Sequence, residues 1–249
     1  MDRNQENGLR QFYNHHSLMI ALVLVIAYVI VTGNLRSNGY NESCIMTLWL
    51  FTVTIFLLIL NRLLHLSDDL GLEKFTMNRK SLYLLGLLVI PSVNLIAGLH
   101  FTKPVSALVF SSISMILVGF IEEVIMRGYL FLALRKDSLV QAIVISSVAF
   151  GVGHIANLFT GQEPLETVLQ IVYAFGVGLV FALVLVRTGN LWPCIITHSL
   201  VDFLSVYSGE LSNQMYILVT MLLIIYCLVY SWYLLKKKPP LELSRRQKI

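Results

Sequence analysis

Six ionisable side chains occur inside stretches that are otherwise apolar, and together they could catalyse a hydrolysis. They lie in VGFIEEVIMRGYLFLAL, SSVAFGVGHIANL and LWPCIITHSLVDF, and they are Glu122, Glu123, Arg127, His154, His198 and Asp202. A charged side chain at the centre of a membrane helix costs about 2.5–3.5 kcal/mol on insertion scales. We therefore interpret these residues as a candidate functional site.

Glutamate and histidine are residue types that activate water, because each can take its proton as a general base. Glu122, His154 and His198 could also be ligands of a divalent metal, since zinc takes histidine nitrogen and carboxylate oxygen and keeps a water in catalytic sites. Bound zinc lowers the pKa of that water to about 7. The sequence thus predicts either a metal-dependent hydrolysis, with Zn²⁺ as the expected ion, or a glutamate-driven one, and does not separate the two.

The spacing within each stretch indicates how these side chains pair. Residues four apart share one face of a helix, so Glu123 can pair with Arg127 and His198 with Asp202. A carboxylate behind an imidazole orients the ring and raises its basicity. Glu122 and Glu123 diverge by about 100° around the helix axis. We therefore expect the two glutamates to have different roles.

The elements that must position these residues are membrane helices. The chain is 57% hydrophobic and 13% charged, whereas soluble domains are about 25% charged. Apolar stretches long enough for helical spans, which need about 20 residues each, lie near 18–32, 44–60, 81–99, 105–134, 139–158, 165–187, 191–207 and 215–235. The predicted fold is an all-α polytopic membrane bundle of about eight helices.

We divide the chain into three parts. Residues 1–80 hold the N-terminal helices and a cytoplasmic interfacial loop, residues 81–235 the catalytic membrane bundle, and residues 236–249 a basic cytoplasmic tail. The three cysteines, Cys44, Cys194 and Cys227, show no disulfide spacing and are expected to be reduced thiols in the packing.

The net charge is +4, and the distribution of the basic residues indicates how the chain is oriented in the membrane. Fifteen lysines and arginines fall on one side of the spans, whereas Arg36 and Lys103 fall on the other and Arg127 lies within a span. By the positive-inside rule, both termini face the cytoplasm. We therefore expect a multi-pass membrane protein whose partners are the lipid bilayer and a membrane substrate, and no nucleic acid.

The predicted topology brings the ionisable residues to one layer of the membrane. Measured from the cytoplasmic ends at 1.5 Å per residue, Glu123 and Asp202 are each roughly 18 Å deep, His154 roughly 22 Å and His198 roughly 12 Å. Taken singly, each group has a simpler interpretation: a structural ion pair for Glu123 and Arg127, a packing histidine at position 154, or a proton relay for His198 and Asp202. Their common depth favours one shared site.

The three motifs, Glu122-Glu123-x-x-x-Arg127, Phe150-x-x-x-His154 and His198-x-x-x-Asp202, resemble those of the CAAX-protease and bacteriocin-processing (CPBP, or Abi) family of intramembrane proteases. The similarity covers roughly residues 85–207. It implies an eight-helix bundle whose catalytic cavity faces the cytoplasm, and an endopeptidase that cleaves peptides near or within the membrane.

The resemblance also implies a role for each residue. Glu122 and His154 would activate water, Glu123 and Arg127 would complete and orient that centre, and His198 and Asp202 would bind metal or stabilise the oxyanion. The last position is Asn or Asp in the family. Because a carboxylate donates no hydrogen bond unless protonated, we assign Asp202 to orienting His198.

The predicted function is therefore an intramembrane endopeptidase acting on a membrane-associated or lipidated peptide. The short chain resembles bacterial members in the cell membrane, with prenyl-CAAX processing, pheromone processing and bacteriocin immunity as possible contexts. Two other classes stay open: a non-catalytic peptide-binding immunity protein or scaffold, and an ion-coupled transporter. Substrate and oligomeric state have no signal in the sequence.

Overall fold

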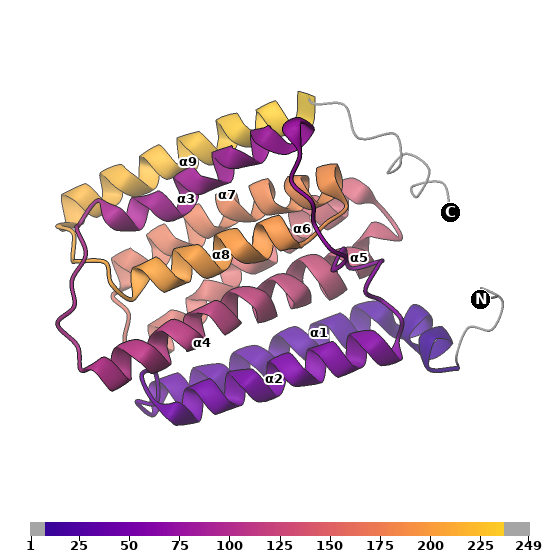
Figure 1. Ribbon diagram of the computed structural model, residues 1–249, viewed down its shortest axis with the longest axis horizontal. Coiled ribbons are helices and arrows are strands. Elements are labelled where there is room, and N and C mark those ends of the chain that lie inside the picture. Colours follow the sequence, from indigo (N-terminus) through magenta and orange to yellow (C-terminus); the bar gives the residue numbers. More distant parts are fainter. Residues whose placement is uncertain (1–7, 237–249) are drawn as a thin grey trace.

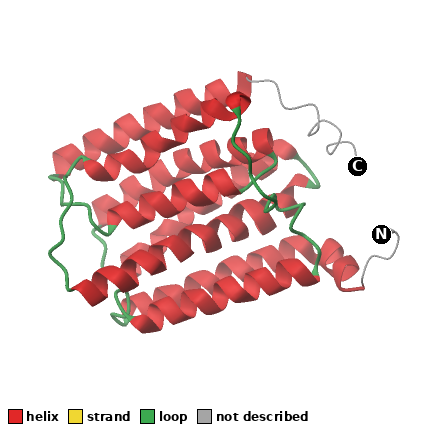
Figure 2. Ribbon diagram, in the orientation of Figure 1, coloured by secondary structure: helices red, strands yellow, loops and turns green. Residues whose placement is uncertain are grey.

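The computed structural model describes residues 8–236, and over this range the chain is a bundle of helices joined by loops (Figure 2). No strand occurs among these residues, and a single antiparallel bridge joins Leu99 to Ser208. The predicted all-α fold is confirmed. Apart from Lys236, the basic tail lies outside the described residues, and the proposed division of the chain into three parts stays a prediction.

The helices follow one another up and down the bundle. They are α1 (Gly8–Ser37), α2 (Cys44–Leu63), the 3₁₀ segment η1 (Arg79–Leu88), α3 (Val89–Ser92), η2 (Val93–Leu95), α4 (Val105–Glu123), the π-helix η3 (Val124–Leu130), α5 (Phe131–Arg135), α6 (Leu139–Gly153), the 3₁₀ segment η4 (His154–Thr160), α7 (Pro164–Thr188), α8 (Trp192–Ser205) and α9 (Asn213–Lys236).

Six of the eight expected spans are helices long and apolar enough to cross a membrane. The other two are shorter. The segment 79–95 reaches roughly 32 Å because its 3₁₀ residues rise about 2.0 Å each, which matches a hydrocarbon core of about 30 Å. Helix α8 is 14 residues long, or roughly 21 Å, and it packs against α4, α7 and α3 inside the bundle.

The bundle is layered, as Figure 1 shows. The α1–α2 pair forms one side and the pair of α3 and α9 the other, with α4, α6, α7 and α8 between them. The main packing partners are α6 with α7, α4 with α8, α7 with α9, and α2 with α4. The helices that carry the candidate residues therefore lie at the centre.

Glycine sets the closest approaches between these central helices. A Cβ on Gly119 of α4 would lie 2.5 Å from the backbone nitrogen of Ser199, and one on Gly151 of α6 would lie 2.7 Å from the carbonyl oxygen of Ile171. Real Cβ atoms essentially never approach that closely. Gly151 therefore brings α6 close to α7, whereas Gly153 has no neighbour within 4 Å of an added Cβ.

The two ends of the bundle differ in which segments they hold. We call the end with Gly8 and Lys236 the near end, and the end with the loops 38–43, 96–104, 161–163 and 206–212 the far end (Figure 1). At the near end, Arg10 pairs with Asp69 at 2.6 Å. At the far end, Lys103 pairs with Glu42. The chain crosses the bundle eight times and returns to its starting side.

Candidate active site

The six candidate residues, which the sequence places on three separate spans, meet at the centre of the bundle. Glu122 and Glu123 end α4, and Arg127 lies in η3, the π-helix that continues it. His154 follows the last residue of α6, and His198 lies midway along α8. Phe150 joins the two histidines, with ring centroids 5.2 Å from His154 and 5.4 Å from His198.

A buried chain of charged groups runs from Arg127 through Glu123 to His198. Arg127 Nη1 donates to Glu123 Oε1 at 3.1 Å, as the spacing predicts, and the same oxygen lies 2.9 Å from His198 Nδ1. Glu123 is 0% exposed and Arg127 1%. Buried charges persist only when they are paired, so this chain is a rigid support beneath the site.

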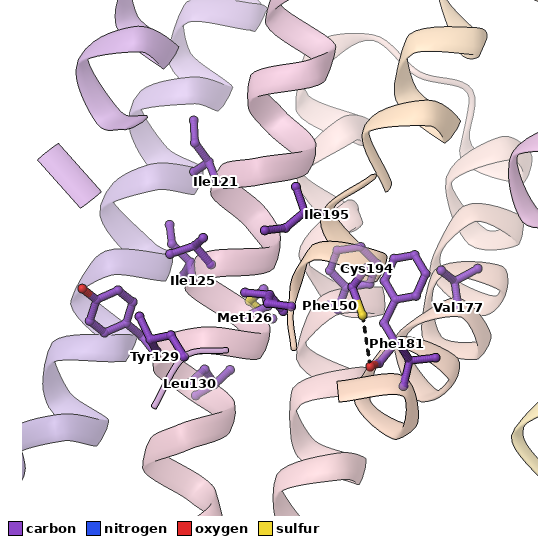
Figure 3. Close-up of a cluster of buried hydrophobic side chains, with 14 of the residues drawn as sticks. Ile121, Ile125, Met126, Tyr129, Leu130, Phe150, Val177, Phe181, Cys194 and Ile195 are labelled. Carbon is purple, nitrogen blue, oxygen red and sulfur yellow. Dashed lines mark hydrogen bonds between the residues drawn. The ribbon is translucent and has the colours of Figure 1, made fainter. Parts of the chain in front are cut away.

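Aromatic rings enclose the arginine. Its guanidinium carbon lies 4.0 Å from the ring centroid of Phe150 and 5.7 Å from that of Phe181. Figure 3 shows these two rings beside Cys194, whose thiol contacts the carbonyl oxygen of Phe181 at 3.4 Å. A desolvated cation over aromatic faces gains about 2 kcal/mol or more. The cysteine is thus a packing thiol, as is the buried Cys227, whereas Cys44 is exposed.

The π-helix continues α4, so that both glutamates and the arginine lie on consecutive helical segments. Segments of this kind appear mostly as single turns within α-helices, frequently at functional sites. Every residue from Val124 to Leu130 is buried. An added Cβ at Gly178 of α7 would meet Arg127 Nη2 at 3.0 Å. The guanidinium therefore occupies space that a larger residue on α7 would fill.

Glu122 and Glu123 face different surroundings, as their angular separation predicts. Glu122 is partly exposed to a cavity, where Tyr28 of α1 donates to its Oε1 at 3.3 Å and His198 Nε2 lies 3.9 Å from its Oε2. Of the two carboxylates, Glu122 is the one accessible to a substrate.

His154 has its orientation fixed by its own helix. Its Nδ1 lies 2.9 Å from the carbonyl oxygen of Phe150, one turn earlier. Since a carbonyl only accepts, we assign the proton to Nδ1. Nε2 is then the ring nitrogen with a free lone pair, which is the form that a base requires.

The structure places two carboxylates beside the His198 ring, and the assignment of Asp202 to orienting that ring stays a prediction. Asp202 Oδ2 lies 3.4 Å from His198 Nε2, so the two are neighbours. The hydrogen bond that fixes the ring, however, joins Nδ1 to Glu123 on another helix. Helical spacing reveals neighbours along α8 and cannot reveal a carboxylate brought in by α4. Asp202 instead lies beside the nitrogen that faces the cavity.

Two cavities meet at the histidines. The smaller, of about 230 Å³, lies between α1, α4, η4 and α8, and the larger, of about 540 Å³, between α3, α7, α8 and α9. Both are lined by Phe150, His154, Gln170, His198 and Asp202, and Glu122 lines the smaller. Their linings extend toward the far end, to Ser205 in one and Ser208 to Asn213 in the other.

The predicted zinc ligands, Glu122, His154 and His198, line one cavity. Within residues 8–236, no three His, Cys, Asp or Glu side chains are grouped so that they could hold a metal ion. The Nδ1 atoms of His154 and His198 are hydrogen-bonded to Phe150 and Glu123 respectively, which leaves Nε2 of each ring facing the cavity, as in metal-binding histidines. Zinc dependence therefore stays a prediction, and no step below uses a metal.

Sequence reasoning missed three residues of the site. Tyr28 and Arg36 come from α1, a stretch without a motif, and both line the smaller cavity. Gly119 lies one turn before Glu123 and admits α8 against α4. One signal could have marked this face of the first span. Polar residues recur there once per helical turn, at Tyr28, Thr32 and Arg36.

Comparison with known proteins agrees with the motifs. Residues 104–204 match the family described as Type II CAAX prenyl endopeptidase Rce1-like. This range contains all six candidate residues and confirms the suspected resemblance. Searches among curated proteins and among solved structures each find no match.

Proposed function

We propose that the chain is a member of the Rce1-like family of type II CAAX prenyl endopeptidases, whose model matches residues 104–204, and that it is an intramembrane endopeptidase in which Glu122 and His154 activate water. The observation that carries this proposal is the convergence of a cavity-facing carboxylate and two oriented imidazoles on one cavity.

In the proposed reaction, a water in the smaller cavity loses a proton to the Glu122 carboxylate or to His154 Nε2 as its oxygen attacks the carbonyl carbon of the scissile bond. General-base assistance of this kind contributes typically 10²–10⁴-fold. The proton then passes to the peptide nitrogen as the C–N bond breaks. The products are a new carboxylate and a new amine.

His198 would stabilise the negative oxygen of the tetrahedral intermediate. Its Nδ1 is held by Glu123 at 2.9 Å, so Nε2 is the nitrogen that points into the cavity. In the protonated imidazole, Nε2–H is a donor that can bind an oxyanion, and such preorganised donors are often the largest catalytic contribution. Glu123 and Arg127 act as positioning residues through this ring.

A cleavage assay on purified protein in lipid vesicles tests the function. Quenched prenylated CAAX peptides and a panel of leader-type peptides serve as substrates. We expect Glu122→Gln and His154→Ala each to lower the rate at least 100-fold, whereas the matched control Glu73→Gln, at the exposed near end, retains it.

The same assay separates the competing hypotheses. Retention of cleavage in Glu122→Gln would overturn the proposed chemistry. A peptide-binding protein would be favoured if wild type cleaves no peptide and Glu122→Gln still preserves function in cells. Adding a chelator and then zinc distinguishes the metal-dependent mechanism from the glutamate-driven one. Loss of cleavage with the chelator and its recovery with zinc would require a metal.

The proposed substrate is a membrane-associated or lipidated peptide, because the site lies within a bundle of membrane helices. The cavities extend toward the far end, away from Gly8 and Lys236. If the positive-inside rule sets the orientation, that end is not cytoplasmic. We therefore propose that the cavity faces the non-cytoplasmic side, in place of the cytoplasm-facing cavity that the resemblance implies.

A further inference from the structure

Arg36 is a cation in the catalytic cavity without a role in the chemistry above. It lies in the last turn of α1 and is partly buried. It lines the smaller cavity together with Glu122 and His154, and it is the only lysine or arginine in that lining. Its charge acts across the cavity on His154 and Asp202.

No protein group contacts this charge directly within residues 8–236. Arg36 forms no ion pair and no side-chain hydrogen bond there, whereas Lys103, on the same far end, pairs with Glu42 and the buried Arg127 pairs with Glu123. A guanidinium has five donors in a planar fork that matches a carboxylate or phosphate. At membrane depth such charges normally find a partner. The geometry points to an anionic group of a ligand.

The distance from Arg36 to the reacting centre limits where that group lies. Tyr28 marks the centre, because it donates to Glu122. Arg36 follows eight residues later on the same face of α1, roughly 12 Å along the helix. An extended peptide spans about 3.3–3.6 Å per residue. Three to four residues therefore reach from the scissile bond to the guanidinium.

The larger cavity has no lysine or arginine in its lining. Glu166 and Glu210 lie in that lining with Asp202. A carboxylate would be repelled there, since like charges juxtaposed in a binding site are costly. Although Glu122 and Asp202 also line the smaller cavity, only that cavity has an arginine, so we expect a peptide with a free carboxyl end to lie across the histidines with that end in the smaller cavity.

We propose that Arg36 binds the C-terminal carboxylate of the substrate, three to four residues beyond the scissile bond, while the preceding segment occupies the larger cavity. This proposal rests on the proposed function and deepens it, because it makes Arg36 a specificity-determining residue that lies outside the matched residues 104–204.

The test compares two peptides that differ only in their last group, a free carboxylate or a carboxamide. Charge-assisted hydrogen bonds differ enough from neutral ones that we expect wild type to prefer the acid by about 10- to 100-fold in kcat/KM. Arg36→Gln should abolish this preference by raising KM for the acid and not for the amide. Arg36→Lys should restore part of it, and the control Lys103→Gln should retain all of it.

Peptide length gives a second readout of the same geometry. In acids with one to six residues after the scissile bond, the effect of Arg36→Gln should be largest at three or four. An equal loss for acid and amide at every length would show a structural role and overturn the proposal.

A lipid phosphate is the other possible source of the anion, and lipid composition separates the two. The assay is run in phosphatidylcholine vesicles with and without phosphatidylglycerol. A defect of Arg36→Gln that depends on phosphatidylglycerol and is equal for both peptides would assign Arg36 to a headgroup and overturn the proposal.

Binding to a non-cleaving protein distinguishes this proposal from the proposed function. Fluorescent acid and amide peptides are titrated onto Glu122→Gln and onto Glu122→Gln/Arg36→Gln. If wild type cleaves nothing but the acid binds in an Arg36-dependent manner, the proposed hydrolysis has failed and the carboxylate site stands. Equal binding of acid and amide by Glu122→Gln would overturn the carboxylate site itself.

Discussion

At the scale of single residues, Glu123 has two partners that need it for different reasons. It neutralises Arg127, which is fully buried between aromatic rings, and it holds the Nδ1 side of His198. Asp202, in contrast, is partly exposed and lies 3.4 Å from Nε2. The two carboxylates next to the same imidazole should therefore respond very differently to removal of their charge.

Glu123→Gln should lower both stability and activity, whereas Asp202→Asn should lower neither strongly. Removing one member of a buried pair leaves the other charge uncompensated, at a cost of about 3–5 kcal/mol. We expect cleavage to fall at least 100-fold in Glu123→Gln and less than tenfold in Asp202→Asn, with thermal unfolding in lipid measured on the same samples. If Asp202→Asn is the more damaging change, Asp202 and not Glu123 orients the ring.

The sequence predicts this part of the site well where partners share a helix and poorly where they do not. Pairing of Glu123 with Arg127 follows from a four-residue spacing, and the convergence of both histidines follows from counting depth along helices. The bond from Glu123 to His198 and the contact of Tyr28 with Glu122 join helices 75 and 94 residues apart in the chain. No local pattern encodes those contacts.

At the scale of helices, the position of His198 depends on how closely α8 approaches α4. Gly119 faces Ser199, the residue after His198, and it leaves no room for a side chain. Small residues of this kind let membrane helices approach closely. This approach sets the distance between the Glu123 carboxylate and the imidazole.

Gly119→Ala should therefore separate α4 from α8 and uncouple the two halves of the site. The added Cβ would lie 2.5 Å from backbone, which cannot rotate away. We expect a loss of cleavage of at least tenfold together with a lower unfolding temperature. The control is Gly33→Ala on α1, where an added Cβ meets nothing within 4 Å. Equal, small effects of the two changes would contradict the importance of this contact.

Most helical spans were predictable to within a few residues, because twenty-residue apolar stretches are strong signals. The first span is the exception, since it was expected at 18–32 and α1 runs from Gly8 to Ser37. The details that matter for the site were not. The π-helix over Val124–Leu130 and the end of α6 at Gly153 arise from packing between helices. A regular 3.6-residue pattern in the sequence does not predict where the π-helix begins or where α6 ends.

At the scale of the whole molecule, charge and cavity lie at opposite ends of the bundle. Most lysines and arginines at helix ends lie at the near end, with Arg62, Arg135, Arg187 and Lys236 in the last turns of their helices, whereas Arg36 ends α1 at the far end. The cavity linings extend the other way, toward Arg36, Ser205 and the loop 206–212. The two ends of the bundle therefore differ. The orientation of the bundle in the membrane decides which compartment supplies the peptide.

An exposed cysteine at the far end allows the orientation of the bundle in the membrane to be measured. Cys44, at the start of α2, is exposed at the far end, while Cys194 and Cys227 are buried. If the positive-inside rule holds, a membrane-impermeant maleimide added to intact cells should label Cys44. A matched cysteine at the near end, Ser67→Cys in a Cys44→Ser background, should be labelled only after permeabilisation, because Ser67 is exposed in the loop after α2. The reverse pattern would place the cavity on the cytoplasmic side, and the substrate would then be a peptide that has not left the cell.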